Sequence, residues 1–142
     1  MEGSVSNNLH GGFKIRYDNF VLCVDGVYVK NGKILLVKRN VEPFKNYWHL
    51  VGGHVEENES IKHALKREFK EETGLNIEVG AIIDFRTEKT SDRTKIILVL
   101  KVTYATGKIK INRENSEYAW FSKNPQKSIN DYTKYLDNTR NR

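Results

Sequence analysis

The sequence predicts an α/β fold in which a mixed sheet lies between helices. Two β-rich runs, 19–30 and 33–39, flank Asn31-Gly32, the dipeptide typical of a tight hairpin. Apolar residues at helical spacing follow in 60–73, and two further β-branched runs come after them. Strands on both sides of a helix favour layered α/β packing, although this pattern leaves the strand order open.

The length and composition predict one domain. A chain of 142 residues is long enough to bury a core, so we expect a single domain over 1–142 with flexible ends at 1–12 and 137–142. No apolar run approaches the roughly 20 residues of a membrane helix. The N-terminus lacks the pattern of a secretory signal, and the one cysteine, Cys23, cannot form an internal disulfide. We therefore expect a cytoplasmic protein that does not enter a membrane.

The formal net charge of +6 is compatible with an acidic partner. Much of the excess lies on the outer face of the expected helix and in the C-terminal tail, and no run of five or six like charges occurs. Nucleic acid binding is therefore not excluded but not favoured. A phosphorylated small molecule needs only a local basic patch.

A loop over 40–47 leads from the first hairpin to Gly52-Gly53, where glycines allow backbone carbonyls to approach an ion or a phosphate. The helix begins after Asn58 or Ser60, both good N-caps, and ends at Gly74 in the left-handed conformation. The later elements are strands over 76–86 and 95–106 around a polar loop at 87–93 that is long enough to overhang a site, short strands at 108–112 and 117–121, and a helix over 128–135.

The helix over 60–73 has an unusual inward face. At about 100° per residue, its apolar stripe of Ile61, Ala64, Leu65 and Phe69 continues into acidic residues. These are Glu68 and Glu72, with Glu71 at the margin, whereas the opposite face carries Lys62, His63, Lys66, Arg67 and Lys70. A surface helix with Glu–Lys pairs is the competing interpretation, and the inward phase of the acids argues against it.

Acids in this position destabilise a helix that has no ligand. Like charges one turn apart repel by about 0.2–0.5 kcal/mol per pair. Glu71 and Glu72 also lie near the negative end of the helix dipole, which disfavours each by about 0.3–1 kcal/mol. A bound cation would make the same acids stabilising, because it attracts them. Oxygen ligands without cysteine or paired histidine favour Mg²⁺ or Mn²⁺ over Zn²⁺. The pattern therefore indicates metal-assisted hydrolysis of a phosphate anhydride.

The same stretch fits the pattern G-x5-E-x7-R-E-U-x-E-E-x-G-U with Gly53, Glu59, Arg67, Glu68, Phe69, Glu71, Glu72, Gly74 and Leu75. This pattern resembles the Nudix box, and the chain is similar to MutT-like Nudix hydrolases from Leu35 to Trp120, loosely outside the box. The resemblance implies an α/β/α sandwich around a mixed sheet, in which the box forms a loop-helix-loop motif.

The resemblance also implies an activity. Water would attack a nucleoside diphosphate linked to another group, such as a nucleotide sugar, ADP-ribose, a dinucleotide or an NTP, with more than one Mg²⁺ or Mn²⁺ ion. The metal would be held by the carbonyl of Gly52 and by Glu68, Glu71 and Glu72, and Glu68 would also orient or deprotonate the water. Arg67 would orient Glu71, and the remaining box residues are Gly53, Glu59 and Gly74. Outside the box, Arg39 is a candidate phosphate contact, and Glu114 and Glu117 are candidates for a further acid.

Three residues depart from the usual family pattern. Val51 replaces a proline and leaves the loop less rigid, Phe69 replaces an aliphatic residue, and Asn58 stands where glycine is common. None of the three removes a metal ligand. The alternatives are a pyrophosphohydrolase acting on RNA 5′ ends and a non-catalytic module that binds nucleotide or RNA, and the sequence is compatible with a homodimer.

Overall fold

The computed structural model describes residues 4–5, 15–16 and 19–136. The ends expected to be flexible, 1–12 and 137–142, lie outside the described residues apart from β1. The strands and the helix are β1 (Ser4–Val5), β2 (Ile15–Arg16), β3 (Phe20–Val27), β4 (Val29–Lys30), β5 (Lys33–Arg39), β6 (Trp48–His49), β7 (Val51–His54), α1 (Ile61–Thr73), β8 (Asn76–Lys89), β9 (Thr94–Thr106) and β10 (Asn115–Phe121).

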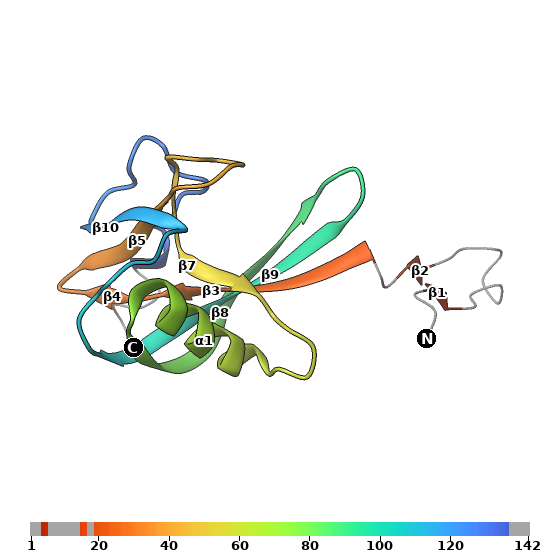
Figure 1. Cartoon of the computed structure of the whole chain (residues 1–142), viewed down its shortest axis with the longest axis horizontal. Coiled ribbons are helices and arrows are strands. Elements are labelled where there is room, and N and C mark those ends of the chain that lie inside the picture. The colour runs from red at the N-terminus through yellow and green to blue at the C-terminus, as the bar shows by residue number, and fades with distance from the viewer. Residues whose placement is uncertain (1–3, 6–14, 17–18, 137–142) are drawn as a thin grey trace.

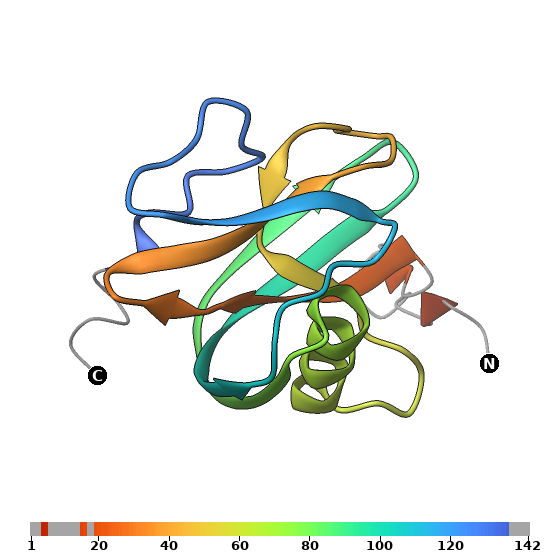
Figure 2. The ribbon, with the colours of Figure 1, turned by 60° about the vertical axis from the view of Figure 1, so that its left-hand side comes forward.

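The main body contains two sheets (Figures 1 and 2). One is mixed, with the order β7-β3-β9-β8, and only its central β3–β9 pair is parallel. The other is antiparallel, with the order β10-β5-β4, and β6 also pairs with β5. The predicted mixed sheet is confirmed. The predicted hairpin at Asn31-Gly32 is confirmed as well, with φ angles of 55° and 76° that suit these two residue types.

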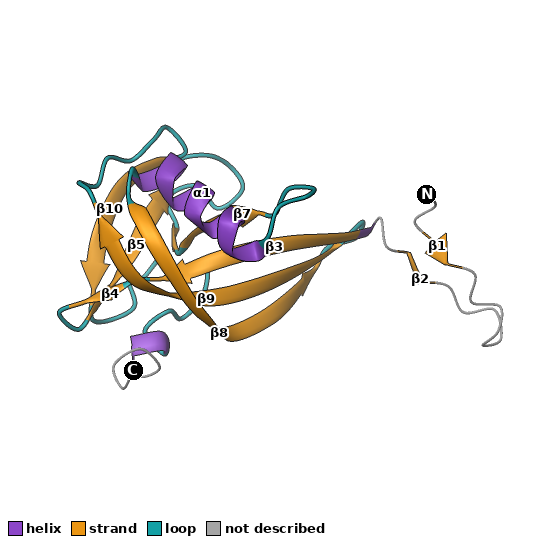
Figure 3. Ribbon diagram, turned by 90° about the horizontal axis from the view of Figure 1, so that it is seen from below, coloured by secondary structure: helices purple, strands orange, loops and turns teal. Residues whose placement is uncertain are grey.

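Helix α1 covers one face of the strands (Figure 3). Ser60 caps it by accepting a hydrogen bond from the backbone N–H of His63, and Gly74 ends it in the left-handed region at φ 77°. Its apolar stripe buries Leu65 and Phe69 completely against the first core cluster, and each side chain of this size contributes about 1.5–3 kcal/mol when it leaves water. The unusual Phe69 has room because Gly26 of β3 lies directly beneath its ring.

A second core cluster lies on the other side of the mixed sheet, where Tyr132 and Tyr135 pack on Val27, Ile97 and Val99. The helix predicted over 128–135 is wrong. Helical backbone begins only at Tyr135 in the described residues, and 128–134 consist of turns and irregular structure. The reason is a competing set of backbone hydrogen bonds that join this segment to Trp48 of β6, from its N–H to Lys127 and from Ile129 to its carbonyl.

One smaller prediction also fails. The predicted strand at 108–112 is an irregular segment, because the N–H of Lys110 bonds to the carbonyl of Thr73 at the end of α1 instead of to a sheet. The polar loop expected at 87–93 is present but shorter, over 90–93, since β8 runs to Lys89 and β9 begins at Thr94. No helix among the described residues is long and apolar enough to cross a membrane.

Candidate active site

The site is built around the glycines of β7. This strand pairs with β3 so that Gly52 lies opposite Asp25 and Gly53 opposite Val24. A Cβ at Gly53 would collide with the carboxylate of Glu68, which reaches across from α1. A Cβ at Gly52 would instead collide with the backbone carbonyl of Val24. Glycine is therefore required at 53 by the position of an acid and at 52 by the packing of two strands.

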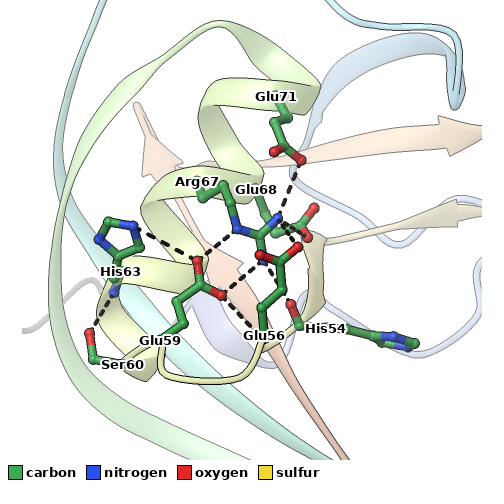
Figure 4. A network of polar contacts seen from close by, with 8 residues as sticks. All are labelled: His54, Glu56, Glu59, Ser60, His63, Arg67, Glu68 and Glu71. Carbon is green, nitrogen blue, oxygen red and sulfur yellow. Dashed lines mark hydrogen bonds and ion pairs between the residues drawn. The ribbon is translucent and has the colours of Figure 1, made fainter.

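Arg67 connects α1 to the loop that precedes it (Figure 4). Its Nε donates to Oε2 of Glu59 at 2.7 Å, and its Nη2 donates to the carbonyl of His54 at 2.9 Å. Its Nη1 donates to Glu68 at 3.0 Å and to Glu71 at 3.3 Å. One guanidinium thus orients three carboxylates and the end of β7, and this use of all its donors is the fork geometry that lysine lacks.

Glu59 supports both sides of this arrangement. Its carboxylate accepts from Arg67 and from the backbone N–H of Glu56 at 2.9 Å. These hydrogen bonds, with that from Arg67 the strongest, lower the pKa of Glu59 to about 2. The residue stays charged across the neutral range and closes the loop over 56–59. Within that loop Asn58 takes a left-handed φ of 66°, as expected for asparagine at a position where glycine is common.

Glu68 and Glu72 form an acid pair on the inner face of α1, in which Glu72 is buried and Glu68 is partly buried. Glu72 is only 3% exposed, and its Oε1 accepts from Nδ2 of Asn115 at 3.0 Å. Burial, followed by a hydrogen bond to Glu68 and the charge of that residue, raises the pKa of Glu72. A hydrogen bond between two carboxyl groups requires a proton on one of them. Two carboxyl groups this close repel each other when both are charged, and a bound cation would relieve that repulsion.

The third acid of the box lies apart from this pair. Glu71 has a side chain that is 55% exposed, and it contacts Arg67. In the described residues no three His, Cys, Asp or Glu side chains meet as a ready ligand group. The donor set is nevertheless all oxygen, consisting of the carboxyl groups of Glu68 and Glu72 and the neighbouring backbone of β7, and it fits a hard divalent cation.

A cleft of about 240 Å³ lies on the other side of β7. Its lining includes Asp25, Arg39, His49, Arg86, Lys95 and Tyr132, together with both glycines of β7. Cys23, Ile97 and Tyr132 in its wall belong to the second core cluster, so the cleft opens on the face of β3 and β9 that α1 does not cover. Gly53 therefore lies between the acid pair and the cleft.

The floor of the cleft carries an ion pair. Nη2 of Arg86 donates to Oδ2 of Asp25 at 3.3 Å, and the two side chains are 21% and 18% exposed. Burial raises the pKa of Asp25 to about 6, and the guanidinium of Arg86 only partly opposes this shift. Two groups of opposite charge in the lining of a cleft are suited to fix the orientation of a bound molecule.

Of the candidates outside the box, Arg39 lies at the cleft, where its Nε donates to the carbonyl of Pro43 at 2.6 Å. Glu114 lies close enough for its charge to raise the pKa of Glu72. Glu117 lies on β10 and pairs with Lys38 at 3.3 Å. Val51 replaces the usual proline, and we expect its loop to be less rigid for that reason. In the structure Val51 is a fully buried residue of β7.

The sequence reasoning missed Asp25, Arg86 and Asn115. The inward direction of Asp25 could have been predicted, because Asp25 follows Cys23 by two residues in an apolar strand and therefore lies on the same face. Arg86 gave a weaker signal at the end of a β-branched run. Asn115 gave none, because a bulge between Asn115 and Glu117 decides where its side chain points.

Known proteins resemble this chain in sequence and in fold. The NUDIX domain family model matches residues 20–129. An ADP-ribose pyrophosphatase of Methanocaldococcus jannaschii is 34% identical, over 80% of this chain and 73% of that protein. A nucleoside triphosphatase, NudI, of Escherichia coli is 36% identical over 54% of this chain and 62% of its own length, which is less than two thirds of that relative. The fold resembles the crystal structure of a MutT NUDIX hydrolase from Burkholderia pseudomallei, with a TM-score of 0.76, 22% identity and coverage of 84% and 98%.

Proposed function

Because the chain belongs to the Nudix family, we propose that it hydrolyses a phosphate anhydride bond in a nucleoside diphosphate linked to another group, with Mg²⁺ or Mn²⁺. The observation that carries this proposal is the acid pair of Glu68 and Glu72 behind Gly53, with a cleft on the other side of the same strand. A metal held by the pair is thereby adjacent to a space that accepts the rest of the substrate.

The residues on the two sides of β7 would have different roles. Glu68, Glu72 and the carbonyl of Gly52 would hold metal, and Glu71 would join them when its exposed side chain leaves Arg67. When bound, the metal polarises the phosphate and lowers the pKa of water. Glu68 lies where it can orient that water, because Arg67 fixes its carboxylate against Gly53. On the cleft side, Arg39 and Lys95 supply positive charge to phosphate.

ADP-ribose is the first substrate to test, because the relative that matches most of the chain carries that name. Nucleoside triphosphates come second, on the name of the Escherichia coli relative. We expect the reaction in the cytoplasm, where both classes of nucleotide are found.

The experiment incubates the protein with Mg²⁺ and a panel of ADP-ribose, nucleotide sugars, dinucleotides, NTPs and an RNA with a 5′ triphosphate, and resolves the products by chromatography. Glu68→Gln should lose activity by orders of magnitude, whereas Glu57→Gln, at an exposed position of the loop that precedes α1, should match the parent. Activity that survives excess chelator contradicts the metal assignment. Preference for RNA supports a 5′-end pyrophosphohydrolase, and binding without turnover supports a non-catalytic module.

A further inference from the structure

Asn115 is a buried asparagine outside the box that touches the acid pair. It is 4% exposed, it begins β10, and its Nδ2 lies 3.0 Å from Oε1 of Glu72. A carboxylate can only accept hydrogen bonds, so the amide nitrogen of Asn115 must face Glu72 whenever that acid is ionised. The amide oxygen then faces the opposite way.

The amide oxygen meets His49. Nε2 of this histidine lies 3.2 Å from Oδ1 of Asn115, and Nδ1 lies 2.8 Å from the carbonyl of Leu50. Both ring nitrogens therefore face oxygen atoms, and the contact with Asn115 is a hydrogen bond when Nε2 carries the proton. His49 also lines the cleft. Glu72, Asn115 and His49 thus form a continuous chain of contacts from the acid pair to the cleft wall.

The backbone is arranged to make this chain. Along β10, the register slips between Asn115, which pairs with Arg39, and Glu117, which pairs with Lys38. A bulge of this kind changes the direction of a side chain next to a site. Without it, Asn115 would follow the regular alternation of the strand. The slip is therefore an independent sign that its inward direction is specific.

We propose, on the basis of the proposed function, that Asn115 is a positioning residue that holds Glu72 in the orientation required for metal binding, and that His49 positions Asn115 in turn. One oxygen of Glu72 accepts from the amide, and the remaining lone pairs of the carboxylate would be available to a metal. Residues that orient a ligand in this way commonly change metal affinity about 10- to 100-fold when they are mutated.

The test measures Mn²⁺ binding without substrate, by calorimetry, and then kcat and KM separately. Asn115→Ala should weaken Mn²⁺ binding about 10-fold or more and should lower kcat more than it raises KM. The matched control is Asn40→Ala, since Asn40 donates to the carbonyl of Arg113 in the same segment but is exposed and does not touch Glu72. It should bind Mn²⁺ like the parent.

His49 gives a second test that does not alter Asn115. His49→Leu removes the ring nitrogen that faces Oδ1 of Asn115 and should weaken Mn²⁺ binding, although His49 touches neither acid of the pair. His49→Gln supplies a permanent N–H donor at a similar reach and should restore binding. In the Asn115→Ala background, His49→Leu should have no further effect, because the two residues act through one chain of contacts.

The outcomes separate the two proposals. If the parent binds Mn²⁺ and the Asn115 and His49 variants bind it equally well, the positioning role is wrong and the proposed function is untouched. If Asn115→Ala does not fold, the His49→Leu and His49→Gln pair decides the question alone. A parent that binds no Mn²⁺ overturns the metal-dependent function and this inference together.

Discussion

The carboxylate of Glu68 rests on the backbone of Gly53, with no space between them for the Cβ of any other residue. This contact defines how close α1 can come to β7. A carboxylate at the end of a flexible side chain can move away at little cost, whereas a strand backbone cannot. The two glycines of β7 are therefore expected to respond differently to the same small substitution.

Gly53→Ala should fold with a free energy of unfolding within about 1 kcal/mol of the parent, yet lose about 100-fold in activity, because a shift of about 1 Å at the reacting groups has an effect of this size. Gly52→Ala should instead destabilise by about 2 kcal/mol or more, because its Cβ meets the carbonyl of Val24. Denaturant unfolding and initial rates distinguish the two. Equal loss of stability in both variants would contradict this division.

Glu72→Gln should leave the protein in chelator as stable as the parent, or up to about 1 kcal/mol more stable. Glutamine keeps the acceptor for Asn115 and adds a donor for Glu68, and it removes a buried group whose pKa is raised by burial and by that neighbour. Millimolar Mg²⁺ should then raise the thermal midpoint of the mutant less than that of the parent. A clear loss of stability in chelator would show that the charge of Glu72 has a structural role.

Gly26→Ala should destabilise by about 1–3 kcal/mol, because the new Cβ collides with the ring of Phe69. In a Phe69→Leu background the same substitution should cost about 1 kcal/mol less, since the smaller side chain leaves room. A double-mutant cycle by urea unfolding measures this coupling. Additive effects would mean that Leu65, the other neighbour of Gly26, controls the site.

Relative to the parent, the free energy of unfolding of Asp25→Asn should increase as the pH rises from about 4 to about 7. The pKa of Asp25 is raised from 3.8 to about 6 by burial. The folded protein therefore binds this proton more tightly than the unfolded chain, and the parent loses stability as the pH rises between these two values. The loss is about 1–3 kcal/mol, whereas asparagine does not titrate.

The measurement for Asp25 is the free energy of unfolding at several pH values between 4 and 7. The mutation also removes the partner of Arg86, which shifts the free energy of unfolding of the mutant by a constant amount. The prediction therefore concerns only the difference in slope between the two curves of unfolding free energy against pH. Asp92→Asn, on the exposed turn between β8 and β9, is the control and should run parallel to the parent. Parallel curves for Asp25→Asn would show that Arg86 holds the pKa of Asp25 at its ordinary value.

Local signals in the sequence were sufficient for the helix and its ends. The spacing of Leu65 and Phe69, the cap at Ser60 and the left-handed Gly74 all depend on a few neighbouring residues, and each matches the structure. The family pattern added the strand arrangement around them. The acids that point inward are visible for the same reason, since helical phase alone places Glu72 on the buried face.

Features that depend on distant partners were not predictable in this way. Ile129, Tyr132 and Tyr135 have helical spacing, but backbone hydrogen bonds to Trp48 determine the conformation of their segment. Asn115 acquires its direction from a slipped register with β5. The ion pair of Asp25 and Arg86 joins residues 61 positions apart, and nothing in the local pattern of either strand indicates the other.

The position of Gly53 between the acid pair and the cleft restricts how such a scaffold can diversify. Any larger residue at 53 disturbs the acid pair, and any larger residue at 52 disturbs the strand pairing. This part of the cleft lining therefore cannot be varied to admit a new substrate. Changes in selectivity must arise elsewhere in the lining of the cleft, at positions such as Arg86, Glu88, Lys95 and Tyr132. A family with this architecture can keep one reaction and replace the group that it acts on, through mutations that leave the acid pair unchanged.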